Sequence, residues 1–210
     1  MKIAIIGTGN VGSALAYGLA GKGYDLILGT RSVDSANVTE LAEKTGAKVD
    51  DPVAAADIAD IVILSLPWTV AEEAVPALGD LSGKIVIDCM NPLGMVDGAL
   101  GLTIGHNRSG GEIVATWLPG ALVVKTLNQV GAEIMARNDH LPLRPVMFMA
   151  GNDAQAKEAV SAILTALGFQ PMDAGDITKS RLLEPFGMVW INQALMQGAG
   201  RDWAFAAASA

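Results

Sequence analysis

The first 32 residues constrain the fold of this chain more than any other stretch. Residues 2–6 form a short apolar run rich in isoleucine, which is typical of a strand buried on both faces of a parallel sheet. A glycine-rich turn follows directly, then a helical pattern over residues 13–20 and a second strand over residues 25–29. This order predicts an α/β fold with a doubly wound parallel sheet of the Rossmann type.

The turn after the first strand has the spacing G-x-G-x-x-G. Its residues are Gly7, Thr8, Gly9, Asn10, Val11 and Gly12. The first glycine makes the tight turn, the second lets a pyrophosphate approach the backbone, and the third lets helix and strand pack closely. The spacing alone is weak, but here it lies between a strand and a helix. It therefore predicts a dinucleotide site with the phosphates at the helix N-terminus.

The end of the second strand indicates which dinucleotide is bound. NAD-binding chains often have an acidic residue there for the ribose 2′-hydroxyl, whereas this chain has Thr30, Arg31 and Ser32. A guanidinium and two hydroxyls suit a 2′-phosphate, which an acidic side chain would repel. We therefore predict NADP(H) as the cofactor. The alternative is that Arg31 is only a solvated turn residue.

Two later strands should end at the same edge of the sheet. The strand at residues 60–66 leads into Pro67 and Trp68, and the strand at residues 84–88 leads into Asn91 and Pro92. Ligands of doubly wound sheets bind outside the carboxyl ends of the strands. We expect the first end to lie beside the adenosine half of the cofactor, through Ser65, Leu66 and Pro67.

Asn91 and Pro92 form a turn signal, so their fixed backbone and amide are expected to orient the nicotinamide. An ordinary loop is the alternative. Trp68 is either part of the site or a side chain of the core. The glycine-rich residues 94–111, which include His106, are expected to form a long ordered loop that is part of a lid.

The second half of the chain changes in character. It is predicted to contain these elements: a helix at 109–118, strands at 121–128, 144–151 and 168–175, a helix at 153–167, and a long apolar helix from 179 to about 207. We expect residues 1–128 to form the NADP-binding domain and residues 129–210 a smaller extension that completes the acceptor pocket. The last helix is apolar nearly all round and must bury that surface, so a homodimer is predicted.

Composition excludes several classes of partner. The net charge of −8 argues against nucleic acid and anionic membranes, because both attract concentrated positive charge. No uninterrupted apolar run of about 18 residues is present, so a cytoplasmic protein is expected. The single cysteine, Cys89, permits no intrachain disulfide and no cysteine metal cluster, and we expect it to be a small buried hydrophobe. No metal site is predicted.

In their order and spacing, these motifs resemble the coenzyme F420-dependent NADP reductases over nearly the whole chain. The matching stretches are residues 5–12, 29–32, 67–68, 91–93, 105–106, 109–110, 117–121, 123–125 with Asn128, 150–153, 173–175 and 180–185. The resemblance implies a dimer that moves a hydride reversibly between NADP(H) and a deazaflavin, coenzyme F420. It also implies that Thr8, Gly9, Asn10 and Val11 contact the pyrophosphate and that Thr30 and Arg31 contact the 2′-phosphate.

The sequence departs from the family pattern at three places. Ser35 stands where some members have a basic residue near the 2′-phosphate. Residues 125–129 read Lys-Thr-Leu-Asn-Gln where Lys-Ala-Phe-Asn-Thr is common, and Arg108 replaces a small hydroxyl residue. The last two departures lie near the expected acceptor pocket.

Hydride transfer between two ring systems requires stacking and exclusion of water more than acid–base groups. The expected pocket walls are Met90, Asn91, Pro92, His106, Leu127, Asn128 and Met188. His106 is a candidate to hydrogen-bond the acceptor ring, or a surface histidine without a role. Two alternative functions remain. One is NADPH-dependent reduction of a flavin, quinone or carbonyl, with His106 or Lys125 as the acid for a carbonyl, and the other is a non-catalytic NADP sensor.

Overall fold

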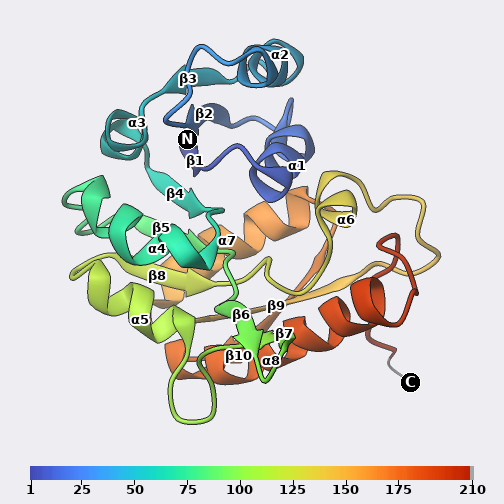
Figure 1. The fold of residues 1–210 in the computed structure, drawn as a ribbon. Helices are drawn as coiled ribbons and strands as arrows, with labels where there is room; N and C mark the ends of the chain where they lie inside the picture. The colour runs from blue at the N-terminus through green and yellow to red at the C-terminus, as the bar shows by residue number, and fades with distance from the viewer. Residues whose placement is uncertain (209–210) are drawn as a thin grey trace.

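A computed structural model of the chain describes residues 1–208, which form a large sheet covered by helices on both faces (Figure 1). The strands are β1 (Lys2–Ile6), β2 (Asp25–Gly29), β3 (Lys48–Asp50), β4 (Ile61–Leu64), β5 (Ile85–Asp88), β6 (Leu93–Val96), β7 (Ala99–Leu102), β8 (Leu122–Lys125), β9 (Val146–Gly151) and β10 (Gln170–Gly175). The α-helices are α1 (Asn10–Leu19), α2 (Ala36–Thr45), α3 (Pro52–Ile58), α4 (Trp68–Ala74), α5 (Gly110–Trp117), α6 (Ala132–Ala136), α7 (Ala154–Ala166) and α8 (Ser180–Ile191). Short helical turns are η1 (Pro76–Leu78), η2 (Ile177–Lys179) and η3 (Asn192–Met196).

The main sheet has the strand order β10-β9-β8-β5-β4-β1-β2-β3. In this order, neighbouring strands are parallel from β8 through β5, β4, β1 and β2 to β3, and β1 lies between β2 and β4. The predicted fold class, a doubly wound parallel sheet of the Rossmann type, is confirmed. Crossover helices place all carboxyl ends of these parallel strands at one edge, which is where such sheets bind ligands.

Alternating side chains of the strands face two separate cores. In β1, Ile3 and Ile5 face α1, α2, α6 and α7, whereas Ala4 and Ile6 face α3, α4 and α5. Figure 1 shows the two helical layers on opposite sides of the sheet. Because both faces are covered, the central strands β1, β2, β4, β5 and β8 are largely apolar, which is why they appear in the sequence as hydrophobic runs.

The C-terminal extension continues the same sheet. β9 pairs antiparallel with β8, and β10 pairs parallel with β9. The helix between them, α7, packs against the same core as α1. The hydrogen-bonded sheet therefore runs across residue 128, although the division into two domains at that position stays a prediction.

The expectation of a long ordered loop over residues 94–111 was wrong in its first part, which forms strands. β6 and β7 form an antiparallel hairpin, with Asp97 and Gly98 at its turn. Both turn residues have positive φ, 50° and 81°, as a two-residue hairpin turn of type I′ requires. The Asp-Gly pair was the signal for this hairpin in the sequence.

The predicted helix to about residue 207 was also wrong in its second half. α8 ends at Ile191, continues as the π-helical turn η3, and is followed by Gly198 and Gly200 in left-handed conformations. Residues 198–208, here called the C-terminal strap, fold back without helix. The Val146 amide donates to the Phe205 carbonyl at 2.9 Å, which fixes the strap beside β9. Among the helices of residues 1–208, none combines the length and apolar character needed to span a membrane.

Candidate functional site

A cleft of about 910 Å³ lies at the carboxyl ends of the parallel strands. Its walls include most of the predicted site residues: Gly7, Thr8, Gly9, Asn10, Val11, Thr30, Arg31, Ser32, Ser65, Leu66, Pro67 and Asn91. Gly12, Pro92 and His106 are not among the lining residues. Segments that are distant in the sequence thus meet at one surface, as parallel topology requires.

The glycine turn between β1 and α1 is tightly packed on one side and open on the other. Gly7 has a φ of +101°, and a Cβ at Gly12 would lie 1.9 Å from the Gly7 carbonyl oxygen. A Cβ at Gly9 would meet nothing within 4 Å. Gly12 therefore lets α1 approach the turn, whereas Gly9 leaves space beside the backbone for a ligand.

The N-terminus of α1 is suited to bind an anion. Gly9 is its N-cap, with no capping side chain, and the first turn has no acidic residue. The first N–H groups of a helix have no intrahelical acceptor, and the helix dipole adds partial positive charge at the same point. The Ser13 hydroxyl donates to the Thr8 carbonyl at 3.1 Å, which holds the turn in place.

The end of β2 forms a corner of the cleft. The Thr30 amide donates to the Asp50 carbonyl, and the Thr30 hydroxyl accepts from the Ser32 amide at 3.2 Å. Arg31 is exposed, lines the cleft and has no ion-pair partner within residues 1–208. Its charge is therefore available to a ligand phosphate.

The end of β4 contributes support and an aromatic wall. The Ser65 hydroxyl lies 2.9 Å from the Ile6 carbonyl oxygen and 3.0 Å from that of Gly7, so it fixes the glycine turn. Trp68 is half-buried and lines the cleft. It also stacks on Trp117 with ring centroids 5.4 Å apart. Trp68 thus belongs to the cleft and to the core packing at once.

Three side-chain amides join the segments that follow β5 and β8 to each other and to β9. The Asn91 amide nitrogen donates to the Asn128 carbonyl at 2.8 Å, and the Asn128 amide nitrogen donates to the Asn91 side-chain oxygen at 2.9 Å. Gln129 donates to Asn128 and exchanges hydrogen bonds with the backbone of Phe148. Asn91 lines the cleft, but protein contacts already use both ends of its amide.

A buried charge cluster lies close to this network. Lys125 is wholly buried, with its Nζ 3.0 Å from Asp88 and 3.0 Å from Glu184. It also donates to the Met90 carbonyl at 2.5 Å, whereas Glu184 accepts from the amides of Gly110 and Gly111. Burial alone would lower the pKa of Lys125, but the two carboxylates outweigh it and hold the pKa above its ordinary value.

Lys125 therefore does not match the expectation of an accessible proton donor. It is absent from the cleft lining, and its ammonium is enclosed by two carboxylates and a carbonyl. Its contacts instead clamp the backbone of Met90, whose amide donates to Asp88 at 2.9 Å. This clamp fixes the segment that leads into Asn91. The sequence contains Lys125, but only the fold reveals its partners.

The structure brings together some of the expected pocket walls and leaves out others. Met90, Asn91, Leu127 and Asn128 line the cleft, whereas Pro92, His106 and Met188 do not. His106 is exposed in the loop between β7 and α5. Cys89 is buried as expected, and burial together with Asp88 raises the pKa of its thiol.

Several lining residues were not found from the sequence. They come from the hairpin, the segment before α6, the end of α8, η3 and the strap: Leu93, Leu100, Val130, Gly131, Trp190, Ile191, Leu195 and Arg201. Leu93 belongs to the matching stretch 91–93 but had no predicted role, and the other residues belong to no recognisable motif and reach the cleft through long-range packing. Leu127, which the sequence did suggest, has a φ of +58° while wholly buried, an uncommon conformation for a leucine.

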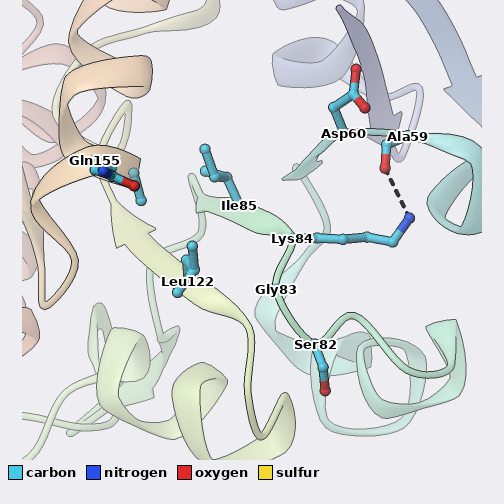
Figure 2. Close-up of a pocket in the computed structure, with 9 residues that line it drawn as sticks. Ala59, Asp60, Ser82, Gly83, Lys84, Ile85, Leu122 and Gln155 are labelled. Carbon is cyan, nitrogen blue, oxygen red and sulfur yellow. Dashed lines mark hydrogen bonds between the residues drawn. The ribbon is translucent and has the colours of Figure 1, made fainter.

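A second hollow, of about 540 Å³, lies at the opposite edge of the sheet (Figure 2). Its lysine, Lys84, extends to the end of α3 and donates to the carbonyls of Ala59 at 2.8 Å and Asp57 at 2.5 Å. That contact caps a helix C-terminus, so the charge is already used. Because ligands of doubly wound sheets bind at the carboxyl edge, the larger cleft is the candidate site.

Comparisons with known proteins identify the family of the chain. Residues 2–92 match the family profile described as NADP oxidoreductase, coenzyme F420-dependent. A crystal structure described as a candidate F420-dependent NADP reductase from Arthrobacter sp. FB24 is 32% identical, with a TM-score of 0.89 over the full length of both chains.

Two curated relatives extend the comparison. The F420-dependent NADP reductase of Methanothermobacter marburgensis is 27% identical over 209 residues, which cover 91% of this chain and 92% of that protein. The rat metalloreductase STEAP3 is 26% identical over 186 residues, which cover 87% of this chain but 36% of that protein. The chain thus spans about a third of the length of this second relative.

Proposed function

Because the chain belongs to the family of coenzyme F420-dependent NADP oxidoreductases, we propose that it transfers a hydride between NADP(H) and a deazaflavin such as coenzyme F420. NADPH supplies the hydride and the deazaflavin accepts it, or the reverse. The protein binds both ring systems, orients them and excludes water. The observation that carries this proposal is one cleft lined by the glycine turn and the exposed Arg31 together with many apolar side chains.

The phosphate-binding end is assigned to NADP(H). In this proposal Thr8, Gly9, Asn10 and Val11 contact the pyrophosphate, supported by the open space at Gly9 and the uncapped α1 N-terminus. Thr30, Arg31 and Ser32 contact the 2′-phosphate. Arg31 supports this role because it lines the cleft without an ion-pair partner among the described residues.

The apolar end is assigned to the nicotinamide and the acceptor ring. Leu93, Leu100, Trp190, Ile191 and Leu195 line it. Such walls favour a flat, apolar ring and exclude water from the reacting atoms. Asn91 and Leu127, at the ends of β5 and β8, form the floor on which the nicotinamide is proposed to lie.

The lining supports hydride transfer between rings over carbonyl reduction. Carbonyl reduction places a proton donor beside the acceptor. The charged residues of the lining are Arg31, Glu73 and Arg201. His106 lies outside the lining, and Lys125 is enclosed by carboxylates. We therefore keep reduction of a flavin or quinone as the second candidate, because these acceptors have the same ring geometry and the same limited need for an acid.

We also propose that the protein is a homodimer through the outer face of α8 and η3. Leu182, Val189 and Met196 follow one another at seven-residue spacing and are 65%, 50% and 42% exposed. Exposed apolar side chains in such a row are typical of a contact surface. Sedimentation at micromolar concentration should give twice the mass of one chain; the mass of a single chain would contradict the dimer.

The acceptor assay separates the proposed functions. NADPH oxidation is followed by absorbance with a deazaflavin, a flavin or a quinone as acceptor, and NADPH binding is measured by calorimetry. We expect turnover with the deazaflavin to exceed that with the other two. Turnover with flavin or quinone alone favours the second candidate. Tight NADPH binding without turnover favours an NADP-sensing module, and absence of nucleotide binding rejects all three.

A further inference from the structure

The C-terminal strap places a second cation in the cleft. Arg201 lines the cleft, as Arg31 does, but it comes from the other end of the chain. Arg31 follows β2, whereas Arg201 contacts residues of α6 and α8. The mechanism above uses Arg31 and assigns no role to Arg201.

The side chain of Arg201 is held in position before any ligand binds. Its Nε donates to Glu133 at 2.8 Å, and its guanidinium carbon lies 6.0 Å from the ring centroid of Trp190. The Trp190 indole in turn donates to the Trp203 carbonyl at 2.9 Å. The strap is thus anchored at Arg201 and at Trp203, which limits the conformations that the long Arg201 side chain can adopt.

Only part of the guanidinium is occupied by these contacts. Within residues 1–208 the two terminal nitrogens have no hydrogen-bond partner, and the side chain is 39% exposed. A guanidinium has five N–H donors in a planar fork, which matches a phosphate or a carboxylate. Glu133 uses one donor and leaves the fork free for an anion.

Arg201 lies at the apolar end of the cleft. Trp190 packs in one cluster with Leu93 and Leu100 of the hairpin, directly after Asn91 and Pro92. In the sheet, β5 is separated from β2 by β4 and β1. Arg201 is therefore beside the end assigned to the acceptor, and Arg31 is beside the end assigned to the adenosine.

We propose that Arg201 is a specificity-determining residue that binds a phosphate or carboxylate group on the redox acceptor. The proposal rests on the proposed function, because that function assigns the apolar end to the acceptor. An anionic substituent would contact the free fork of Arg201 while the acceptor ring lies against the apolar wall. The site then prefers anionic over neutral acceptors with the same ring.

Two flavins that differ only in a phosphate test this preference. FMN and riboflavin share one ring system, and their binding to NADP⁺-saturated protein is followed by quenching of flavin fluorescence. We expect the full chain to bind FMN more tightly than riboflavin. Arg201→Ala should reduce the affinity for FMN about tenfold or more, the loss of one charge-assisted hydrogen bond, and leave that for riboflavin unchanged.

Matched variants control the experiment. Arg201→Lys keeps the charge without the fork and should lie between the parent and Arg201→Ala. Arg137→Ala removes a nearby exposed arginine that pairs with Asp139, and it should change neither affinity. If Arg201→Ala does not fold, Arg201→Gln retains a polar side chain of similar length and replaces it in the comparison.

Three outcomes would overturn the proposal. The first is equal affinity of the parent protein for both flavins and for 5-deazariboflavin and its 5′-phosphate. The second is an equal loss for charged and neutral forms in Arg201→Ala, which indicates a structural role. The third is a loss of NADPH affinity with an unchanged FMN preference, which assigns Arg201 to the nucleotide. An Arg201-dependent preference without turnover in the acceptor assay would leave this site standing and reject the proposed function.

Discussion

The two ends of the cleft are built in different ways. The end that we propose to bind the phosphates is largely local: β1, the glycine turn, α1 and β2 all lie within the first 32 residues. The end that we propose to bind the acceptor is assembled from the hairpin, the segment after β8, the end of α8 and the strap. The first end offers backbone N–H groups and an exposed arginine, whereas the second depends on buried amides and charges.

This difference has a consequence for specificity. A binding surface made of backbone and glycine changes little when distant side chains change. A binding surface that depends on contacts between remote segments changes its shape when a residue in any of those segments changes. A protein of this fold can therefore retain the nucleotide and alter the acceptor, which agrees with the sequence departures near the acceptor end at residues 125–129.

The largest expected effect concerns the buried cluster under the acceptor end. Lys125→Met leaves the carboxylates of Asp88 and Glu184 buried without their cation. We expect the free energy of unfolding to fall by about 3–5 kcal/mol, the cost of breaking a buried ion pair. Urea denaturation measures it. Lys157→Met, which removes a partly exposed pair with Asp173, should cost at most about 1 kcal/mol. Equal losses in the two variants would contradict the special role of the cluster.

Two glycines sharpen the comparison at the phosphate-binding end. Gly12→Ala places a Cβ 1.9 Å from the Gly7 carbonyl oxygen, which is a steric clash. The free energy of unfolding should fall by about 3 kcal/mol, the upper range for overpacking. Gly9→Ala has free space in the protein and should cost only about 0.5–1 kcal/mol, because alanine is a poorer N-cap than glycine. Calorimetry should nevertheless find weaker NADPH binding in Gly9→Ala. Full affinity in that variant would argue against a pyrophosphate at this turn.

The charge at the end of β2 provides the next test. Arg31→Ala should weaken NADPH binding by about 1.5–3 kcal/mol, the range for a charge-assisted hydrogen bond, because the 2′-phosphate loses its cation. NADH has no such phosphate and should bind as before. Calorimetric titration with both nucleotides measures the difference. Unchanged affinity for both would reject the assignment of this corner.

The smallest expected effect is pH-dependent and lies between α5 and α8. Two hydrogen bonds from Arg181 lower the pKa of Glu112 below its ordinary value of 4.5. Because the pKa of Glu112 is lower in the folded state than in the unfolded state, this ion pair stabilises the fold fully at a pH above the unfolded-state pKa. The stabilisation is lost as the pH falls through the folded-state pKa. Glu112→Gln should thus be less stable at neutral pH by about 0.5–1 kcal/mol.

Thermal unfolding at decreasing pH checks this prediction. The difference between Glu112→Gln and the parent chain should shrink as the pH falls below the folded pKa of Glu112, because the parent then also carries a neutral side chain. Glu72→Gln, an exposed position on α4, is the matched control and should show no such convergence. A difference that persists unchanged into acid would indicate that the carboxylate charge is not its source.

The two errors of the sequence analysis have a common cause. Residues 192–207 contain enough apolar side chains to suggest a helix. In the structure the chain reverses instead, and Trp190, Trp203 and Phe205 bury their rings by packing on one another. In residues 94–111, glycine content concealed the Asp97-Gly98 turn. In both segments, composition was consistent with more than one backbone path, and contacts with α8 decided between them.

By itself, the sequence determined the alternation of strands and helices, the place of the glycine turn and the residues at the carboxyl ends of β2, β4 and β5. These features follow from short-range rules, because a strand, a turn and a helix N-terminus are each specified by neighbouring residues. Only the tertiary structure decided that Lys125 is enclosed by Asp88 and Glu184, that Asn91 is bound to Asn128, and that Arg201 reaches the cleft. Each of these depends on contacts between residues far apart in the chain, and such contacts exist only after the sheet has brought its strand ends together.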